Sequence, residues 1–265
     1  MEYITTDAEG IHICFDEVVY QIYEEENQVF CLNETTNELI SAEVGSELAL
    51  PIQGSSVLYT QHWDTKSLVL YIAETTLMFE RQNTGYYYCN PNGTLSQMVL
   101  VDAVDFHGLE YLGSARGYIW SRVLPLLKNY ILVGSGPDTF AEVFPQNDYA
   151  GKVVYSDNPN MIIEKAHNDF LTKWVQTGLV SVICMAVFYG VFIIKGIQVY
   201  GKKDVVENLD NSGMEFRLGA GCFLACISYM ISGIFNDSNL QTAPIYWVFV
   251  GIVLSSVTVV KRVEK

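Results

Sequence analysis

The residues best suited to acid–base chemistry lie in the stretch Glu164-Lys-Ala-His-Asn-Asp169, shortly before an apolar run. A histidine with a pKa near neutrality can take a proton from a hydroxyl group and later return it. His167 is therefore a candidate general base. A lone histidine is more often a structural hydrogen-bonding residue, so both interpretations stay open at this point.

Two arginines form the second candidate group. Arg116 and Arg122 lie in a segment, residues 115–130, whose apolar residues recur with helical spacing. At about 100° per residue the two side chains point roughly 120° apart, so a straight helix does not readily bring both to one ligand. Pro125 is expected to bend this helix.

A glycine-rich turn follows, Gly134-Ser-Gly-Pro-Asp138. Pro137 suits the first position of a helix, and glycine allows the positive φ angle that precedes it. A helix N-terminus can receive a phosphate, but Asp138 in the first turn opposes that use. We therefore expect a helix to begin here without a ligand.

Three apolar runs must position these groups. A helix needs roughly 20 apolar residues to cross a bilayer core of about 30 Å. The first run meets this length, and the other two are near the lower limit. The runs are Thr177–Tyr200, Leu218–Phe235 and Pro244–Val260. The second carries small residues that suit close helix packing: Gly219, Ala220, Gly221, Ala225 and Ser228.

Basic residues indicate the orientation of these runs. They gather between the first two runs (Lys195, Lys202, Lys203 and Arg217) and after the third (Lys261, Arg262 and Lys265). The connection between the second and third runs, residues 236–243, has none. The positive-inside rule places the basic segments in the cytoplasm and residues 1–174 outside. No signal peptide follows Met1, so either the first run exports the N-terminal segment unaided or further membrane helices of the full-length protein precede Met1; we expect the second.

The N-terminal segment is acidic. Residues 1–115 hold 2 basic and 18 acidic side chains, and this negative field repels nucleic acid and anionic lipid. Short alternating and aromatic runs separated by polar turns predict a β-rich domain. The expected strands are Ile11–Phe15, Val18–Tyr23, Gln28–Leu32, Leu68–Glu80, Tyr86–Cys89 and residues 94–101, and Glu24–Glu26 is expected to be a solvated turn.

The N-terminal segment offers few chemical signals. Cys14, Cys31 and Cys89 cannot all pair with one another, and no metal-binding spacing of cysteine and histidine occurs. The three tyrosines 86–88 could stack on sugar rings, but a half-buried strand explains them equally well. The chain has no nucleophile elbow, P-loop, dinucleotide fingerprint or zinc-protease motif.

Residues 113–190 together resemble the O-antigen ligase and O-antigen polymerase family of integral-membrane glycan transferases. The motifs are R-G-Y-I-W-S-R from Arg116, V-G-S-G-P-D-T-F from Val133, F-P-Q-N-D-Y from Phe144, A-H-N-D-F-L from Ala166 and Q-T-G from Gln176. They occur in the family's order and run into a membrane helix. The remaining helices agree with the family in topology alone.

The resemblance implies a metal-independent transfer of a polyprenyl-diphosphate-linked glycan to a glycan or lipid-linked acceptor outside the cytoplasmic membrane, with no cofactor. His167 matches the family histidine that activates the acceptor hydroxyl, and Arg116 matches an arginine that holds diphosphate oxygens. A guanidinium suits this task because its fixed donors match phosphate oxygens. Arg122, Lys165 and Asn168 are weaker candidates for substrate binding.

We therefore expect an α-helical polytopic membrane protein, the C-terminal helices of a GT-C-like bundle, with a β-rich extracytoplasmic domain. The expected parts are an acidic β-rich domain (1–112), catalytic-loop helices outside the membrane (113–174) and three transmembrane helices (175–265). The family has about ten or more membrane helices, so this chain alone could be inactive. A non-enzymatic, membrane-anchored ectodomain that binds a ligand or partner is the alternative, and a remnant without activity is a third.

Overall fold

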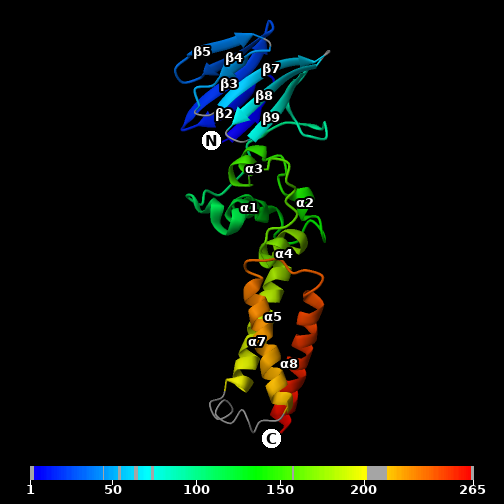
Figure 1. Cartoon of the computed structure of the whole chain (residues 1–265). Helices are drawn as coiled ribbons and strands as arrows, with labels where there is room; N and C mark the ends of the chain where they lie inside the picture. Colours follow the sequence, from blue (N-terminus) through cyan, green and yellow to red (C-terminus); the bar gives the residue numbers. More distant parts are fainter. Residues whose placement is uncertain are drawn as a thin grey trace. The chain divides into compact units, whose positions relative to one another are not determined.

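The structure, a computed structural model, describes residues 3–43, 45–52, 55–62, 65–72, 75–156, 158–201 and 214–263. It divides into two compact units (Figure 1). The sheet unit comprises Met1–Arg122 and Pro145–Ile163, and the helix unit comprises Val123–Phe144 and Glu164–Lys265. The segment expected to hold the catalytic-loop helices, residues 113–174, is thus shared between the two units.

The first sheet of the sheet unit is an antiparallel meander of five strands in the order β1-β2-β3-β4-β5. Two-residue turns join β2 to β3 and β3 to β4, and both central residues of each turn have positive φ angles. The strands are β1 (Tyr3–Thr6), β2 (Ile11–Phe15), β3 (Val18–Glu25), β4 (Gln28–Asn33) and β5 (Leu39–Glu43). The first three strands expected from the sequence are confirmed here.

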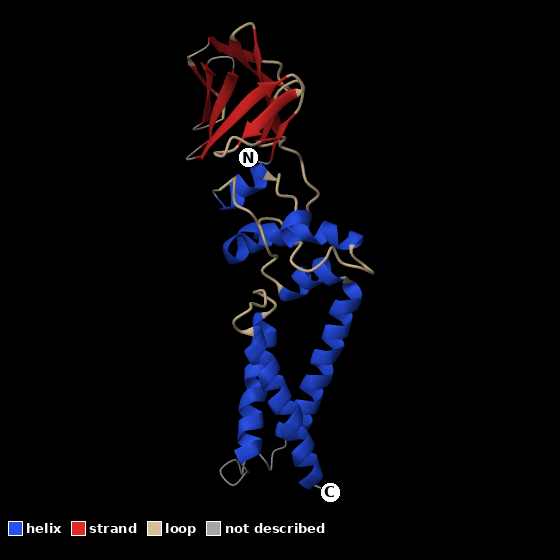
Figure 2. Ribbon diagram, turned by 90° about the vertical axis from the view of Figure 1, so that its right-hand side faces the viewer, coloured by secondary structure: helices blue, strands red, loops and turns tan. Residues whose placement is uncertain are grey.

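The second sheet has six antiparallel strands in the order β11-β10-β9-β8-β7-β6 (red in Figure 2). These are β6 (Glu47–Ala49), β7 (Ser55–His62), β8 (Thr65–Ile72), β9 (Thr75–Gln82), β10 (Gly85–Cys89) and β11 (Leu95–Ser96). The single strand expected over Leu68–Glu80 is wrong, because β8 and β9 form a hairpin in which Ile72 pairs with Thr75. The strand expected over residues 94–101 is shorter than predicted, because β11 has two residues.

One apolar core lies between the two sheets. Every second side chain of a strand points inward, which follows from the two-residue period of a pleated strand. The fully buried members include Ile13, Ile22, Leu70, Phe79, Tyr86 and Tyr88, and Ala150 and Val153 of α3 (Tyr149–Ser156) belong to the same core. Because Tyr86 and Tyr88 are buried, the half-buried strand is the correct interpretation of the tyrosine run.

The prediction that Glu24–Glu26 form a solvated turn is wrong for Glu24. Glu24 is buried, and its carboxylate lies 2.7 Å from Nη1 of Arg81. The Tyr86 hydroxyl accepts a hydrogen bond of 2.7 Å from the Glu24 backbone N–H. The charge can be buried because it is paired with an arginine, so this glutamate joins the two sheets.

Helix α1 (Leu112–Leu126) confirms the helix expected over residues 115–130. It lies between two short 3-10 helices, Leu109–Tyr111 and Leu127–Asn129, and it contains Pro125. Residues 113–115 have left-handed φ angles, so the regular right-handed helix begins at Arg116. The apolar face that the sequence predicted is buried through Ile119, Val123 and Leu127.

The helix expected to begin at Pro137 begins later. Gly136 and Asp138 have φ angles of 123° and 58°, which are incompatible with a right-handed helix, and α2 spans only Phe140–Val143. The turn is held in the helix unit by backbone hydrogen bonds from Ser135 N to Val175 O and from Gly136 N to Gln176 O. The glycine-rich motif therefore forms a turn that packs against the end of another helix.

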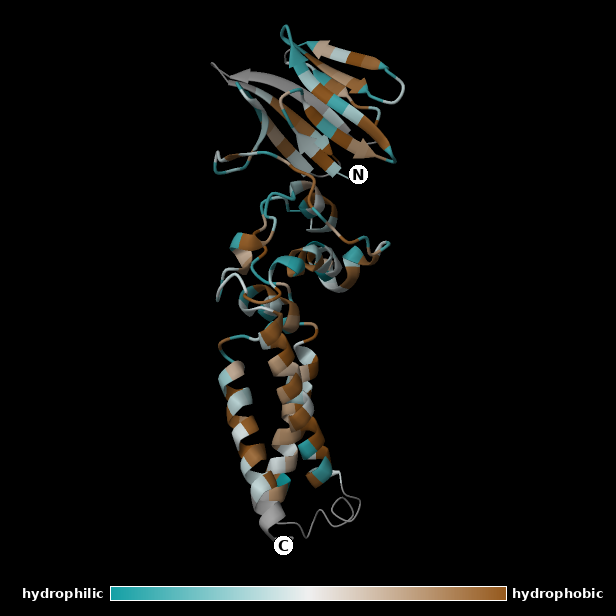
Figure 3. Ribbon diagram, turned by 180° about the vertical axis from the view of Figure 1, so that it is seen from behind, coloured by the Kyte–Doolittle hydropathy of each residue, from teal (hydrophilic) through white to brown (hydrophobic). Residues whose placement is uncertain are grey.

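Three long helices dominate the helix unit, and many of their residues are apolar (brown in Figure 3). They are α5 (Leu179–Tyr200), α7 (Met214–Ser232) and α8 (Ala243–Val263). The short helix α4 (Asp169–Thr177) precedes α5, and Gly178 with a φ angle of 89° joins them. Of the helices within the described residues, α5 alone is both long enough and apolar enough to cross a membrane. Residues 216–232 and 243–258 form shorter apolar helices.

Small residues set the helix packing, as expected for part of the second run. A Cβ atom on Gly219 would lie 2.4 Å from Ser256 of α8 and 2.5 Å from Tyr200 of α5. Gly221, by contrast, faces open space. Of the basic residues used for orientation, Lys195 and Arg217 are exposed, whereas Lys202, Lys203 and Lys265 lie outside the described residues.

Candidate functional site

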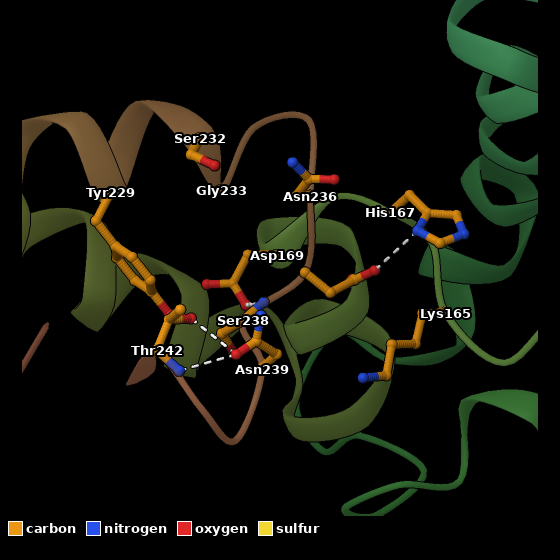
Figure 4. A pocket seen from close by; sticks show the side chains of 11 residues that line it. Lys165, His167, Asp169, Tyr229, Ser232, Gly233, Asn236, Ser238, Asn239 and Thr242 are labelled. Atoms are coloured by element: carbon orange, nitrogen blue, oxygen red, sulfur yellow. Dashed lines mark hydrogen bonds and ion pairs between the residues drawn. The ribbon is translucent and has the colours of Figure 1, made fainter. Parts of the chain in front are cut away.

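A polar pocket of about 500 Å³ lies in the helix unit, where α7 ends and α8 begins (Figure 4). Three segments line it: the loop before α4, the end of α7 and the loop from Gly233 to Thr242. Figure 4 shows Lys165 and His167 on one side and Tyr229 and Thr242 on the other. The lining residues are Lys165, His167, Asp169, Tyr229, Ser232, Gly233, Asn236, Asp237, Ser238, Asn239 and Thr242.

The backbone at His167 is held in an uncommon conformation. Its φ angle is 51°, in the left-handed region that non-glycine residues rarely adopt. The next residue, Asn168, is the N-cap of α4: its side-chain oxygen accepts hydrogen bonds of 3.0 Å from the N–H groups of Phe170 and Leu171. The Asn168 amide also donates to Ile234 O at 2.8 Å. These bonds fix the loop that carries His167 against the loop after α7.

His167 faces a carboxylate across the pocket. Nδ1 of His167 lies 3.4 Å from Oδ2 of Asp237, and the histidine side chain is half exposed whereas the aspartate is 8% exposed. The other carboxylate oxygen of Asp237 accepts a hydrogen bond of 2.5 Å from the Thr172 hydroxyl. Thr172 Oγ1 in turn accepts from Ala166 N at 3.2 Å. One oxygen of the aspartate is thus held by Thr172, and the other oxygen is turned to the histidine.

A second carboxylate in the pocket is engaged through one of its oxygens. Asp169 is buried, and Oδ1 accepts from Lys173 one turn later on α4 and from Ser238 N at 3.3 Å. Its backbone N–H donates to Gly233 O at 2.8 Å. Asp169 therefore ties α4 to the loop after α7, and Lys173 compensates its charge.

This arrangement is suited to proton transfer. With Nδ1 directed at Asp237, the Nε2 atom of His167 is the one left for a ligand in the pocket. A carboxylate beside one ring nitrogen orients the imidazole and stabilises its protonated form, so the other nitrogen can accept a proton from a hydroxyl group. Lys165 adds a positive charge at the same wall.

The structure brings three of the predicted site residues together, with different roles. His167 and Lys165 line the pocket. Asn168 caps α4 and holds the loop, so it supports the site without lining it. Sequence reasoning missed Asp237, which follows Thr172 by 65 positions. The available signal was a charged residue in the short polar connection between the second and third apolar runs.

The two predicted arginines belong to the sheet unit. Arg116 is partly buried, and its side chain folds back over Gly113, whose Cβ would lie 3.3 Å from Cδ of Arg116. Arg122 is engaged with Asp148: Nε donates to Oδ2 at 2.8 Å, and only 14% of its side chain is exposed. Its guanidinium also lies 4.6 Å from the ring centroid of Tyr118. The charge of Arg122 is thus compensated within the fold, and substrate binding by either arginine stays a prediction.

Asp148 is the centre of this network. Its Oδ2 also accepts from the Tyr118 hydroxyl at 3.0 Å, and its Oδ1 accepts from Gly151 N at 3.0 Å. Burial and then the Asp148 charge raise the pKa of Tyr118 well above its ordinary value. The motif F-P-Q-N-D-Y therefore has a structural function in the sheet unit: it supplies the carboxylate that positions Arg122.

Comparisons with protein-family models, with curated proteins and with solved structures gave no match for this chain. Among the described residues, no three His, Cys, Asp or Glu side chains are placed to hold a metal ion. The cysteines at positions 14, 31 and 89 are buried in the sheet unit. The pocket and the motifs are therefore the features of the chain that indicate a function.

Proposed function

We propose that the protein transfers a polyprenyl-diphosphate-linked glycan to an acceptor hydroxyl outside the cytoplasmic membrane, as O-antigen ligases and polymerases do. The observation that carries the proposal is the contact of 3.4 Å between His167 and the buried Asp237 in a pocket at the end of an apolar helix bundle. The sequence motifs within residues 113–190, which resemble those of that family, add support.

In the proposed reaction His167 acts as the general base. Its Nε2 atom takes the proton of the acceptor hydroxyl, and the oxygen attacks the anomeric carbon of the donor sugar. The bond from that carbon to the diphosphate oxygen breaks, and the polyprenyl diphosphate leaves with the bonding electrons. Asp237 stabilises the protonated histidine. Arg116 is proposed to hold the leaving diphosphate, as the family resemblance implies.

We further propose that α5, α7 and α8 all span the membrane, with the pocket on its outer side. The absence of basic residues from the connection that lines the pocket supports this orientation, as do the basic residues near the opposite helix ends. Aromatic contacts near the pocket also agree with it: Tyr229 stacks on Tyr246, and Tyr246 contacts Trp247. Tyrosine and tryptophan are enriched where helices meet the membrane surface.

The proposal is tested by replacing His167 with alanine in the full-length protein and measuring surface glycan on cells that depend on it. We expect the glycan to be lost while the protein still inserts in the membrane at its normal amount. Val187→Ala, on the exposed face of α5 and outside the pocket, is the control and should leave the glycan unchanged. Normal surface glycan in the His167→Ala cells would refute the proposal.

The alternative, a membrane-anchored binding ectodomain, is favoured by one observation. The sheet unit has an apolar core of its own, formed by both sheets and α3. Under this alternative the sheet unit binds a ligand, and replacement of His167 or Arg116 has no effect on the phenotype. The same experiment therefore separates the two functions.

A further inference from the structure

A second pocket lies in the sheet unit and is not explained by the proposed transfer reaction. It is a cavity of about 380 Å³ between the segment 103–110, α1 and α3. Small-molecule sites in proteins span roughly 300–1,000 Å³, so this pocket has room for a ligand of about one or two sugar rings. The lining residues are Ala103, Val104, Asp105, Glu110, Arg122, Gly151, Val154 and Tyr155.

The walls of this pocket are fixed by the fold. Val104 N donates to Ser121 O at 2.9 Å, which holds the segment 103–105 along α1. The buried carboxylate of Glu110 accepts from the N–H groups of Phe106 and Gly108, at 2.9 Å each, and so shapes the turn. The polar groups of the pocket are therefore placed before any ligand arrives, which reduces the entropy lost on binding.

The charges of the pocket disfavour phosphate. Among the described residues that line it, the cation is Arg122, which is already paired with Asp148. Glu110 and Asp105 add two carboxylates, and Oδ2 of Asp105 lies 2.9 Å from Nδ1 of His107. The pocket is thus neutral to negative, and a phosphate group would be repelled. A ligand here is instead neutral and rich in hydroxyl groups, because carboxylates accept and the guanidinium donates hydrogen bonds.

An aromatic surface completes the pocket. The Tyr155 ring lies in the lining and stacks on Tyr118 with ring centroids 5.2 Å apart, and it makes a T-shaped contact with the Tyr111 ring at 4.9 Å. Burial and then the Glu110 charge raise the pKa of Tyr155, so its hydroxyl remains a donor. The C–H face of a pyranose ring packs on such an aromatic ring, while its hydroxyls reach the surrounding polar groups.

We propose that this pocket binds a neutral pyranose residue of a glycan, with Tyr155 against the sugar face and Asp105, Glu110 and Arg122 against its hydroxyls. The binding goes beyond the proposed transfer, because it requires neither His167 nor a diphosphate. Sugar recognition thus falls to the α1–α3 region and not to the tyrosine run of β10.

The test is saturation-transfer NMR on the full chain in detergent micelles with methyl glycosides of glucose, galactose, mannose, rhamnose and N-acetylglucosamine. We expect at least one glycoside to receive saturation. Tyr155→Leu should weaken its binding about tenfold or more. Asp105→Asn, at an exposed position where folding is little affected, should also weaken it. Tyr87→Leu, a half-buried tyrosine on β10, is the matched control and should bind as the unchanged protein does.

Each outcome decides the proposal. It is overturned if no glycoside in the panel binds, if both Tyr155→Leu and Asp105→Asn bind as tightly as the control, or if inorganic phosphate displaces the sugar. His167→Ala separates it from the proposed function. Sugar binding by this variant at full strength supports the pocket whatever the variant does to glycan transfer.

Discussion

At the scale of single residues, the proposed transfer reaction depends on the pair His167 and Asp237. The carboxylate is buried and its second oxygen is held by Thr172, so its free oxygen is directed at the imidazole. A general base typically contributes a factor of about 10²–10⁴ to a rate, and an orienting carboxylate contributes a part of this. This makes Asp237 a positioning residue whose effect must pass through the histidine.

We predict that Asp237→Asn lowers the rate of glycan transfer per folded molecule by about 10²-fold or more. The asparagine preserves the size of the side chain but removes the carboxylate that orients His167. The rate and the amount of folded protein should be measured for the unchanged protein and for the variant. If the variant merely has less folded protein and each folded molecule transfers glycan at the unchanged rate, Asp237 has a structural role alone.

The cap at Asn168 gives a prediction about stability. Asn168→Ala removes the acceptor of two backbone N–H groups of α4 and a bond to Ile234 O. We expect a loss of about 1 kcal/mol in the free energy of unfolding, with little loss for Asn168→Ser, which can still cap a helix. Thermal unfolding in detergent measures both variants. Equal melting temperatures for the alanine and serine variants would show that the cap does not stabilise α4.

Lys152 gives a prediction about pH. Its side chain is 2% exposed, and Nζ donates to Gln146 O at 2.6 Å. Burial lowers its pKa from 10.5 to about 8, although the nearby Asp148 acts in the opposite direction. Because the folded pKa lies below the unfolded one, the unfolded chain binds more protons between these values. The Lys152 contribution to stability therefore rises as the pH increases from about 8 to 10.5.

The measurement compares unfolding of the unchanged protein with that of Lys152→Met at pH 7.5, 9 and 10. The unchanged protein should gain stability relative to the variant across this range. The comparison is needed because Cys31, whose pKa burial raises to about 11, acts with the opposite sign. A stability difference that stays constant with pH would contradict the lowered pKa of Lys152.

At the scale of elements, the packing of α5 on α7 depends on a glycine. A Cβ atom on Gly196 would lie 2.1 Å from the Phe223 ring, whereas Gly190 on the same helix faces open space. We predict that Gly196→Ala lowers the stability of the helix unit by about 1–3 kcal/mol through overpacking, and that Gly190→Ala does not lower it. Thermal unfolding in detergent compares the two, and equal effects would contradict the observed helix contact.

Much of the element structure could be predicted from the sequence. Alternating strands and apolar runs are local patterns, so β2–β4, α1 and the three long helices emerged near their observed places. The errors arose where a single backbone angle or pairing decides the outcome: the hairpin between β8 and β9, and the left-handed Asp138 that delays α2. The contact of His167 with Asp237 was not predictable, because it joins distant segments through the packing of α4 against the loop after α7.

At the scale of the whole molecule, the proposed orientation predicts which positions a labelling reagent reaches. Ser238 lies in the loop after α7 that lines the pocket. Arg217 is exposed near the N-terminal end of α7, whereas the pocket lies at the C-terminal end of this helix. We expect a cysteine at position 238 to react with a membrane-impermeant maleimide on intact cells, and a cysteine at position 217 to react only after permeabilisation. The unchanged protein reports the background from its own cysteines. Labelling of position 217 from outside would reverse the orientation.

The central claim, that His167 is the base for glycan transfer, is tested most directly with purified full-length protein in lipid vesicles. The substrates are a polyprenyl-diphosphate-linked glycan and an acceptor glycan, and the product is the joined glycan measured over time. We predict transfer by the unchanged protein, with and without a metal chelator, and a rate at least about 10²-fold lower for His167→Ala. Transfer by His167→Ala at the unchanged rate would contradict the account.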